Sequence, residues 1–402
     1  MPLIKCREVL PFAGGTDIQS PLLQRIYASR GLHSADDLPR KLNQLPNPSL
    51  LKGIPEALAL LQQAFLQQQS VLIVGDFDAD GATSSALMVL ALKRMGLAQV
   101  DFLVPNRFDY GYGLTPEIVE QALMYRPDII ITVDNGIASH EGIDLARSHG
   151  ITVIVTDHHL PGETLPNADA IINPNQHGCE FPSKAIAGVG VAFFLLLALR
   201  AHLREQQWFV QHGITELNLA EYLDIVALGT VADVVPLDAV NRILVHQGLL
   251  RIRAGKCRAG IKALLTVAKR DFSYITASDL GFAIGPRLNA AGRLDDMTVG
   301  IGCLLANDPA EAHLVAVELD SLNADRRLIE QGMQYEAEQA ISTIDAPAGE
   351  LPAGLCLFKE GWHQGVVGIV ASRIKERYYR PVIAFAKAED GSLKGSARSI
   401  AG

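Results

Sequence analysis

Three clusters of acidic and imidazole side chains each follow directly after a short apolar run. Asp76, Asp78 and Asp80 follow Ser70–Gly75, Asp134 follows Asp128–Val133, and Asp157, His158 and His159 follow Thr152–Thr156. If these runs are parallel strands, the clusters emerge at one edge of one sheet, which is where open α/β sheets bind ligands. Carboxylates crowded at one place repel one another unless a cation holds them. The pattern therefore predicts a divalent-metal site.

Two of these clusters also have an ordinary structural explanation. Asp78 and Asp80 are spaced to aim two carboxylates at a metal pair, with Asp76 supporting them from outside, but Asp also favours turns and helix N-caps. Asp134 precedes Asn135-Gly136, which is a common way to end a strand. Taken one at a time, the two clusters leave both explanations open.

The third cluster and a fourth carboxylate carry more information. Asp157, His158 and His159 combine oxygen and nitrogen ligands, which suits Mn²⁺ or Mg²⁺; the alternative is a capping Asp beside two surface histidines. Asp233 lies in the apolar segment ALGTVADVVPL, which we expect to form a turn between helices, so it must be paired, metal-bound or exposed. Unrelated caps explain the four sites together poorly. Taken together, the four sites predict two metal ions that activate water and clamp a phosphate, as in phosphoester hydrolases.

Candidate phosphate contacts lie in two segments rich in small residues. Gly285–Arg293 offers Arg287, Asn289 and Arg293, in what we interpret as a loop that lets a phosphate approach the backbone. The alternative is a structural loop whose arginines tie helix ends. Near the end of the chain, Ser396, Arg398 and Ser399 resemble a phosphate cradle or, equally, an exposed polar turn.

Two further candidates are single residues. Arg107 follows the second expected strand at the same edge of the sheet, and the nearby Phe108, Tyr110 and Tyr112 could stack on bases or pack in a core. His363 precedes the Gly-hinged start of a helix and is a candidate substrate contact.

Strands alternate with helices between Leu51 and about Thr156, which predicts βαβ units and a parallel sheet. The expected helices are Pro55–Gln68, Ala82–Met95, Pro116–Met124 and Ser139–His149, and a further strand is expected at Gln99–Val104. Beyond Pro182 the pattern becomes helical, with helices at Ala185–Glu205 and Leu219–Leu228. A long polar helix from Pro309 to about Ile344 can act as a rigid connector. A second, small α/β unit begins at Gly354 and looks unfinished, so we expect a truncated chain.

Composition sets the class of protein. The chain has 402 residues, 49% of them hydrophobic, and a net charge of −9, which is globular and leaves room for a local basic groove that binds nucleic acid. The five cysteines are dispersed, at positions 6, 179, 257, 303 and 356, which favours reduced thiols in a cytoplasm. The N-terminus is too short and polar for a signal peptide, and the longest apolar stretch, from Gly188, is too short to span a membrane.

At this point the motifs resemble those of a known superfamily. DFDADGATS, VDNG, TDHH and GTVADVVPL, in this order, resemble the four motifs of the DHH phosphoesterases. The segments VPNRF, GYGL, GPRLNAAGRL, WHQGVVGIVASRI and GSARS resemble a family within it, the bacterial 5′-to-3′ exonucleases specific for single-stranded DNA. The similarity runs from about Leu51 to Gly402.

The resemblance implies an α/β fold in which a parallel-sheet DHH domain is joined by a long helix to a smaller, partial DHHA1 domain. The implied boundaries are a lead-in at 1–50, the catalytic domain at 51–305, the connecting helix at 306–345 and the substrate-binding domain at 346–402. It also implies hydrolysis of single-stranded DNA to 5′-mononucleotides in recombination and repair, two Mn²⁺ or Mg²⁺ ions, a monomer in the cytoplasm, and a single-strand-binding protein and a helicase as partners.

Residue roles follow from the same resemblance. The implied metal ligands are Asp78, Asp80, Asp134, His158 and Asp233, with Asp134 bridging the two ions and Asp76 as a further candidate. Asp157 orients the histidine pair, and His159 stabilises charge on the phosphate or the leaving oxygen. Arg398 and Ser399, with Arg107 and Arg287, hold DNA phosphates, including the 5′ end.

The chain departs from the superfamily in two ways. Val74 stands where many members have a histidine four residues before the first Asp of the pair, so one metal is expected to bind more weakly or to use Asp76 or water. The family's later Gly-Gly-His stretch and its OB-type DNA-binding domain are also missing. Two alternatives remain: a DHH pyrophosphatase or short-oligonucleotide phosphodiesterase, and a non-catalytic DHH scaffold of replication, which the intact motifs disfavour.

Overall fold

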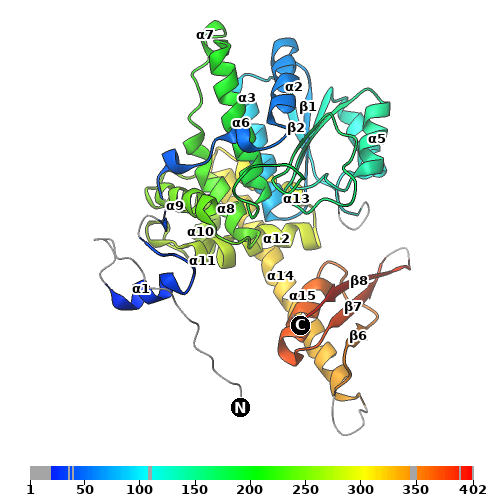
Figure 1. Ribbon diagram of the computed structural model, residues 1–402. Helices are drawn as coiled ribbons and strands as arrows, with labels where there is room; N and C mark the ends of the chain where they lie inside the picture. Colours follow the sequence, from blue (N-terminus) through cyan, green and yellow to red (C-terminus); the bar gives the residue numbers. More distant parts are fainter. Residues whose placement is uncertain are drawn as a thin grey trace.

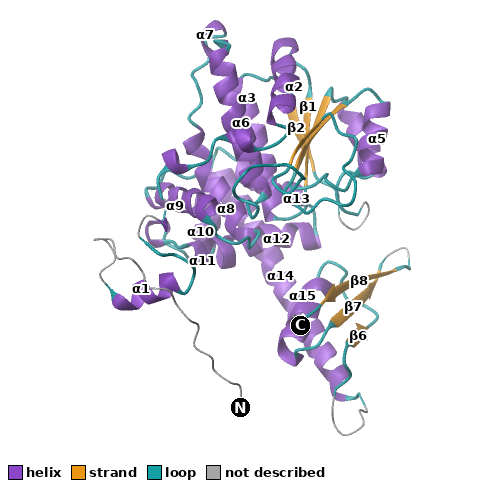
Figure 2. Ribbon diagram, in the orientation of Figure 1, coloured by secondary structure: helices purple, strands orange, loops and turns teal. Residues whose placement is uncertain are grey.

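The computed structural model describes residues 20–34, 37–38, 40–106, 111–344, 351–388 and 391–400 (Figures 1 and 2). The described part of the lead-in includes helix α1 (Pro21–Ala28) and the short 3₁₀ turns η2 (Leu42–Gln44) and η3 (Pro48–Leu50). No helix in the described ranges combines the length and apolarity needed to cross a membrane.

The larger domain is built on a five-stranded parallel sheet in the order β2-β1-β3-β4-β5. Its strands are β1 (Val71–Gly75), β2 (Val100–Leu103), β3 (Ile129–Val133), β4 (Thr152–Thr156) and β5 (Ala170–Ile172). Gly75 pairs with Val133 and Val133 pairs with Thr156, so β1, β3 and β4 end level with one another. The predicted parallel sheet is confirmed; β5, only three residues long, was not predicted.

Helices cover both faces of the sheet, which explains why the central strands are continuous apolar runs. One face packs against α2 (Ile54–Gln67), α3 (Ala79–Met95) and α6 (Gly188–Glu205). The other face packs against α4 (Pro116–Ala122), with its 3₁₀ extension η4 (Leu123–Tyr125), and α5 (His140–Ser148). Alternate strand residues serve the two cores: Ile73 faces α3, and Leu72 and Val74 face α4 and α5.

Helices complete the domain between residues 205 and 305. They are α7 (Trp208–Gln211), η5 (Leu219–Tyr222), α8 (Leu223–Ala232), α9 (Ala239–Arg253), α10 (Ala259–Val267), η6 (Phe272–Tyr274), α11 (Ala277–Asp279), the π-helical turn η7 (Leu280–Ile284), α12 (Gly285–Leu294) and α13 (Met297–Leu305).

One local prediction is wrong in this region, and another is wrong in part. The segment Gly285–Arg293, predicted to be a loop, is helix α12, because Pro286 lies at its start and Arg, Leu, Asn and Ala outnumber its two glycines. The expected turn between helices is present but begins later than predicted: residues 229–232 form the last turn of α8, and Asp233 ends this helix in the connection to α9.

A 34-residue helix, α14 (Pro309–Ser342), leads away from the larger domain to a small C-terminal unit (Figure 1). Asp308 caps it by accepting a hydrogen bond from the Ala310 N–H. The unit contains β6 (Leu355–Phe358), α15 (Val367–Tyr378), β7 (Val382–Lys387) and β8 (Leu393–Arg398), with β6 and β7 parallel and β8 antiparallel to β7.

The C-terminal unit has a hydrophobic core of its own. Met333, Ala337 and Ile341 on the far half of α14 pack with Trp362 and Val366. The helix thus belongs to two cores, one at each end, and the fold class predicted from the sequence is confirmed. The segment Gly395–Arg398, for which an exposed polar turn was one of two alternatives, lies within strand β8.

Candidate metal centre

The residues that follow β1, β3 and β4 meet the end of α8 in one buried cluster. His158 Nε2 lies 3.0 Å from Asp134 Oδ1, 3.6 Å from Asp233 Oδ2 and 4.0 Å from Asp80 Oδ2. The level ends of the strands bring Asp134 and His158 together, and the C-terminus of α8 delivers Asp233 from 75 residues further along the chain than His158.

Three polar atoms of this cluster are buried and have no hydrogen-bond partner in the described part of the chain. They are Asp134 Oδ1, His158 Nε2 and Asp233 Oδ2. Buried polar atoms are normally satisfied, and unsatisfied ones in a native site call for an unseen ion or water. Carboxylate oxygens and an imidazole nitrogen that converge in this way form the ligand set of a divalent cation.

The possible ligand sets overlap, and this gives room for more than one ion. Within each set the donor atoms lie within 4.8 Å of one another; the sets are Asp76 with Asp78 and Asp134, Asp80 with His158 and Asp233, and Asp134 with His158 and His159. Asp134 joins the first set to the third, and its contact with His158 links it to the second. All the residues predicted as ligands are therefore in one place.

Electrostatics show that the cluster lacks compensating positive charge. Burial, and then the neighbouring carboxylates, raise the pKa of both Asp80 and Asp134 well above the usual value. Burial and the charge of Asp78 raise the pKa of Asp233 to about 7. Burial lowers the pKa of His158, which keeps its imidazole neutral and able to donate a lone pair. A bound cation would reverse the penalty on the carboxylates.

Backbone groups fix the first two carboxylates. Asp78 caps α3, and its Oδ1 accepts hydrogen bonds from the N–H groups of Asp80 (2.9 Å) and Gly81 (3.1 Å). Asp80 accepts from the first N–H groups of α6, at Gly188 (2.6 Å) and Val189 (3.0 Å). The positive end of the α6 dipole thus holds one carboxylate of the cluster.

Asp134 is held in an unusual backbone conformation. Its φ is 61°, in the left-handed region that costs a non-glycine residue conformational energy. Gly188 makes this geometry possible, since a Cβ at position 188 would lie 2.8 Å from Asp134 Oδ1 and 2.8 Å from its Cβ. The sequence marked Asp134 as important but gave no sign of Gly188, which lies 54 residues away.

Asp157 positions the histidine loop. Its Oδ1 accepts from the backbone N–H groups of His158 (2.7 Å) and His159 (3.0 Å) and lies 2.8 Å from His159 Nδ1, and its Oδ2 accepts from Ile137 N–H (2.9 Å). Burial works to raise the pKa of Asp157, but the hydrogen bonds to His159 and the backbone lower it overall. The hydrogen bond to Asp157 raises the pKa of His159.

Tyr112 contributes a hydroxyl that sequence reasoning considered only as part of an aromatic ring. The hydroxyl donates to the carbonyl of Asp134 (3.3 Å) and lies 3.4 Å from His159 Nδ1. Burial, and then the charges of the carboxylates, raise its pKa, so it stays protonated. It therefore ties the turn at β3 to the imidazole after β4.

The predicted phosphate contacts on α12 have three different environments. Arg287 is buried and ion-paired with Asp320 of α14 (2.7 Å), which favours the structural alternative for this residue. Asn289 accepts a hydrogen bond from Ala79 N–H (2.8 Å) and so braces the turn between Asp78 and Asp80. Arg293 donates to the carbonyl of Gly365 (3.2 Å), joining α12 to the C-terminal unit.

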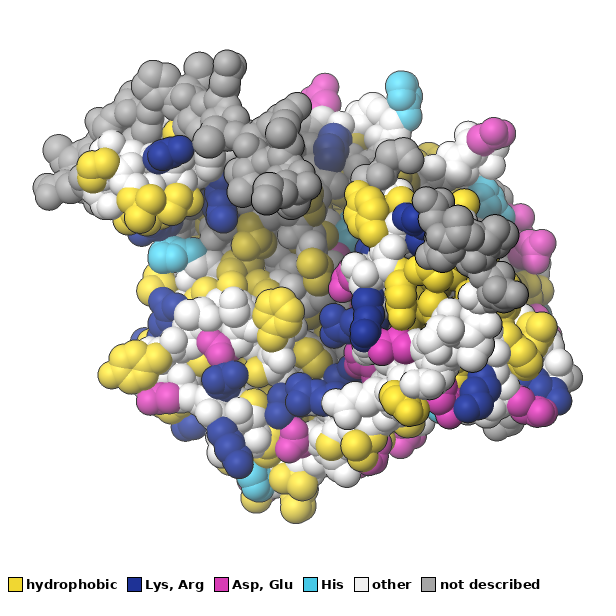
Figure 3. Space-filling view, turned by 90° about the horizontal axis from the view of Figure 1, so that it is seen from below, with side chains coloured by type: hydrophobic (Ala, Val, Ile, Leu, Met, Phe, Trp, Pro, Cys, Tyr) yellow, Lys and Arg dark blue, Asp and Glu magenta, His cyan; other side chains and the backbone are white. Residues whose placement is uncertain are grey.

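A basic cleft of about 600 Å³ lies where α12, η7, α14 and α15 meet. Its walls include Asn289 and Arg293 and residues that sequence reasoning missed: Phe282, Arg326, Arg327 and Arg373. Phe282 is 80% exposed on the π-helical turn. From below, the molecule shows Lys and Arg side chains gathered across the middle of one face, with acidic groups among them (Figure 3).

The remaining predicted contacts lie in the C-terminal unit. Arg398 on β8 donates to Ser396 Oγ (2.9 Å) and Ser372 Oγ (3.2 Å), and a Cβ on Gly368, near the start of α15, would lie 3.2 Å from its guanidinium. His363 Nδ1 accepts from Gly365 N–H (3.1 Å) in the turn before α15.

Two predicted residues add less to this picture. Ser399 is exposed just beyond β8. Arg107, with Phe108 and Tyr110, lies outside the described residues.

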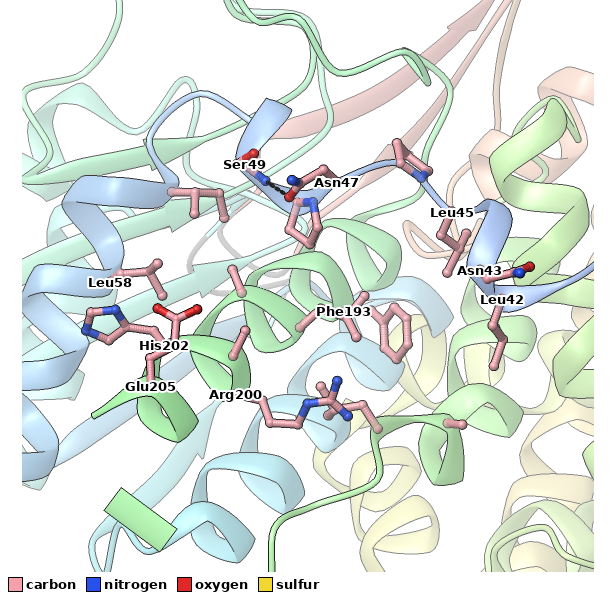
Figure 4. Close-up of a pocket in the computed structure, with 18 of the residues that line it drawn as sticks. Leu42, Asn43, Leu45, Asn47, Ser49, Leu58, Phe193, Arg200, His202 and Glu205 are labelled. Atoms are coloured by element: carbon pink, nitrogen blue, oxygen red, sulfur yellow. Dashed lines mark hydrogen bonds between the residues drawn. The ribbon is translucent and has the colours of Figure 1, made fainter. Parts of the chain in front are cut away.

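A different cavity, of about 700 Å³, contains none of the predicted site residues (Figure 4). It lies between the lead-in segment, α2 and α6, with mainly apolar walls such as Leu45, Leu58 and Phe193 and a polar edge that includes Arg200 and His202. Cavity size therefore does not locate the chemistry of this molecule.

The fold and the buried cluster together define a class of protein. Comparison with known protein families identifies this class. The model of the DHH family, N-terminal domain, matches residues 70–230, and the model of the DHHA1 domain matches residues 352–402. The match to the first model includes every residue of the three strand-end clusters but ends before Asp233.

Individual relatives identify the family within this class. The chain is 62% identical over 381 residues to the single-stranded-DNA-specific exonuclease RecJ of Dickeya dadantii, covering 95% of this chain and 66% of that protein. It is 54% identical over 400 residues to RecJ of Haemophilus influenzae, covering 100% and 69%. The structure of Thermus thermophilus RecJ in complex with Mn²⁺ superposes with a TM-score of 0.76 at 36% identity, covering 93% of this chain and 51% of the other. The chain belongs to the RecJ family. It spans about two thirds of the length of the Dickeya and Haemophilus relatives and about half of the Thermus chain.

Proposed function

We propose that this chain carries the catalytic centre of a metal-dependent exonuclease that hydrolyses single-stranded DNA from the 5′ end and releases 5′-mononucleotides. One observation carries the proposal. Asp134 Oδ1, His158 Nε2 and Asp233 Oδ2 are buried, without hydrogen-bond partners in the described residues, and directed at one point. The relatives bear the name of a single-strand-specific exonuclease, which supports the choice of substrate.

The residues present fit two Mn²⁺ or Mg²⁺ ions. Asp76, Asp78 and Asp134 would hold one ion, and Asp80, His158 and Asp233 the other, with Asp134 between them. When bound, such ions supply a water nucleophile at neutral pH and neutralise the charge of the phosphate under attack. Asp76 would take the place of the histidine that is replaced by Val74, since it lies in the first set.

The chain's own groups do the remaining work. Asp157 holds His159 through Nδ1, and this hydrogen bond raises the pKa of His159, which favours the protonated imidazole. A protonated imidazole beside the centre can stabilise charge on the phosphate or donate its proton to the leaving oxygen. Tyr112 and Asp157 fix the ring from the same side.

We assign DNA binding to the basic cleft and the 5′-to-3′ polarity of hydrolysis to the C-terminal unit. The arginines of the basic cleft would contact backbone phosphates, and Phe282 would stack on a base. Arg398, Ser396 and the start of α15 would hold the phosphate of the 5′ end, because helix N-termini and Arg–Ser pairs both favour anions. An end held at a fixed distance from the metals explains removal of one nucleotide at a time.

The test is the Asp134→Asn variant, assayed on long 5′-labelled single strands with Mn²⁺. Loss of a shared ligand should cost more than about 100-fold in rate, the upper end of what loss of an outer metal contact costs. Replacing one of several repelling carboxylates should leave the melting temperature unchanged or higher. Retained activity would refute the role of Asp134.

The product ladder of the unaltered chain separates the alternatives. Stepwise loss from the 5′ end of long strands supports the exonuclease. Cleavage of short oligomers or pyrophosphate alone would favour a small-substrate DHH enzyme, and no hydrolysis with metal bound would favour a scaffold. The domain boundaries, the protein partners, the monomeric state and the cytoplasmic location remain predictions.

A further inference from the structure

A second concentration of positive charge lies outside the metal centre and the basic cleft. A pocket of about 540 Å³ opens where the C-terminal ends of α3, α9 and α13 meet the start of α10. Five cationic side chains line this C-terminal-end pocket, against one acidic side chain, Glu221; they are Lys93, Arg94, Arg251, Lys256 and Arg258. Such an excess stands out in a chain whose net charge is −9.

Four of these five cations form no ion pair in the described part of the chain, although Arg251 lies near enough to Asp224 to lower its pKa. Arg258 is paired with the buried Asp224 (2.7 Å) and lies over the ring of Tyr222, 4.3 Å from its centre. Within the described ranges, Lys93, Arg94, Arg251 and Lys256 form no ion pair or side-chain hydrogen bond. The Nε of Arg251 is buried as well, which makes it a donor without an acceptor.

Helix dipoles account for only part of this arrangement. Lys93 and Arg94 lie in the last turn of α3 and Arg251 in the last turn of α9, where cations are favourable. Lys256 follows the end of α9 in a loop, and Arg258 caps the start of α10, where the dipole disfavours a cation. Asp224 accounts for the position of Arg258, and a common anionic ligand explains the other four cations.

The pocket is separate from the metal centre but built on the same helices. α3 begins at Asp78 and Asp80 and ends at the pocket, and α8 begins beside Tyr222 and ends at Asp233. Thirteen residues of helix separate Asp80 from Lys93, which corresponds to about 20 Å. A ligand in this pocket therefore does not touch the catalytic groups.

We propose that this pocket binds a phosphate-bearing ligand, either a free nucleotide or a phosphate of a nucleic-acid strand. Lys and Arg donors are the groups that recognise phosphate. The volume falls within the range of small-molecule sites, and Leu90, Leu304 and Leu305 give the pocket an apolar wall. The site goes beyond the proposed exonuclease activity and does not depend on it.

The experiment uses the full chain in EDTA, which removes metal from the catalytic centre. Hydrogen–deuterium exchange is followed in residues 90–97, 219–224 and 251–260 after addition of inorganic phosphate, dTMP, an oligothymidylate or, as the uncharged comparison, thymidine. Protection of these segments is expected with a phosphate-bearing ligand and not with thymidine. Protection by phosphate and dTMP identifies a nucleotide site, whereas protection by the oligothymidylate alone identifies a strand site.

Charge variants supply the control. In the variant Arg94→Gln/Lys256→Gln two exposed cations of the pocket are neutralised, which should weaken binding of the protecting ligand at least tenfold and abolish the protection. Arg126→Gln/Lys269→Gln neutralises two exposed cations elsewhere and should change neither. The proposal is overturned if no ligand protects the three segments, if thymidine protects them equally, or if both double variants bind like the unaltered chain.

Discussion

The metal centre and the basic cleft hold their charges in opposite ways. The side chains of Asp80 and Asp134 are 0% and 2% exposed, and backbone N–H groups or strained backbone fix them in place. In the cleft, Arg326 and Arg373 share Glu330 as an ion-pair partner, but the side chain of Arg373 is 54% exposed, and the exposed Arg327 forms no ion pair or hydrogen bond with the described residues. Bond cleavage needs fixed geometry, because errors of about 1 Å cost rate. Contact with a flexible, charged strand tolerates mobile side chains.

The largest effect on rate should come from a substitution of Gly188, a residue of the metal centre that bears no charge. Gly188→Ala places a Cβ 2.8 Å from Asp134 Oδ1, and the carboxylate must move. We expect kcat to fall about 100-fold with little change in KM for DNA. Gly302→Ala on α13 is the matched control, since a Cβ there has nothing within 4 Å, and its kcat should not change. Equal kinetics for the two variants, measured on single strands, would show that the centre is less rigid than its geometry indicates.

A substitution in the cleft should change KM and leave kcat unchanged. Arg327→Gln removes one cation from the wall of the cleft. If it contacts one phosphate, KM should rise about five- to tenfold at unchanged kcat, and the salt dependence of binding should fall by about one unit of slope. Arg126→Gln, an exposed arginine away from the cleft, is the control. A fall in kcat without a change in KM would contradict the assignment of catalysis to the metal centre and of strand binding to the cleft.

After the metal is removed, the stability of the folded chain should depend on pH, because the buried carboxylates of the centre repel one another. Raised pKa values at Asp80, Asp134 and Asp233 mean that the metal-free folded chain binds more protons than the unfolded chain. Their contribution to stability is complete below the unfolded pKa and is lost as pH rises through the folded values, which for Asp233 is about 7. The raised pKa of His159 acts with the same sign.

The melting temperature in EDTA should therefore fall between pH 6.5 and pH 8. The loss is about 1.4 kcal/mol per pH unit for each extra proton held, or a few degrees. The lowered pKa of His158 acts with the opposite sign near pH 6.5, where the unfolded histidine still binds a proton. Mn²⁺ displaces the protons, so its stabilising effect should be larger at pH 8 than at pH 6.5. A melting temperature in EDTA that does not depend on pH would contradict the raised pKa values.

The two regions also differ in how much the sequence revealed. Asp76, Asp134 and Asp157 each follow a strand within a few residues, so the local pattern together with the parallel sheet was enough to bring them together. Asp233 was identified by its apolar surroundings, and it lies in the predicted turn between helices, although this turn begins four residues later than expected.

The cleft could not be predicted in the same way. Arg326, Arg327 and Arg373 look like ordinary surface residues of two helices far apart in the sequence, and only the packing of α15 on α14 brings them together. The small residues of α12 suggest a loop, but their helix-forming neighbours outnumber the two glycines and the segment is a helix. One of them, Gly292, is required by packing, since a Cβ there would lie 1.8 Å from the carbonyl oxygen of Phe77.

The smallest effect is expected at the hydroxyl of Tyr112. Tyr112→Phe removes two long contacts, 3.3 Å to the Asp134 carbonyl and 3.4 Å to His159 Nδ1. Contacts of this length are weak, and the ring keeps its edge contact with Phe77, so kcat should fall only about two- to fivefold. The pH–rate profile should keep its shape, because the hydrogen bond to Asp157 is the main cause of the raised pKa of His159. Asp157→Asn is the matched comparison and should move the basic limb of the profile to lower pH. If Tyr112→Phe moved that limb as far as Asp157→Asn does, the hydroxyl and not the carboxylate would maintain the charge on the imidazole.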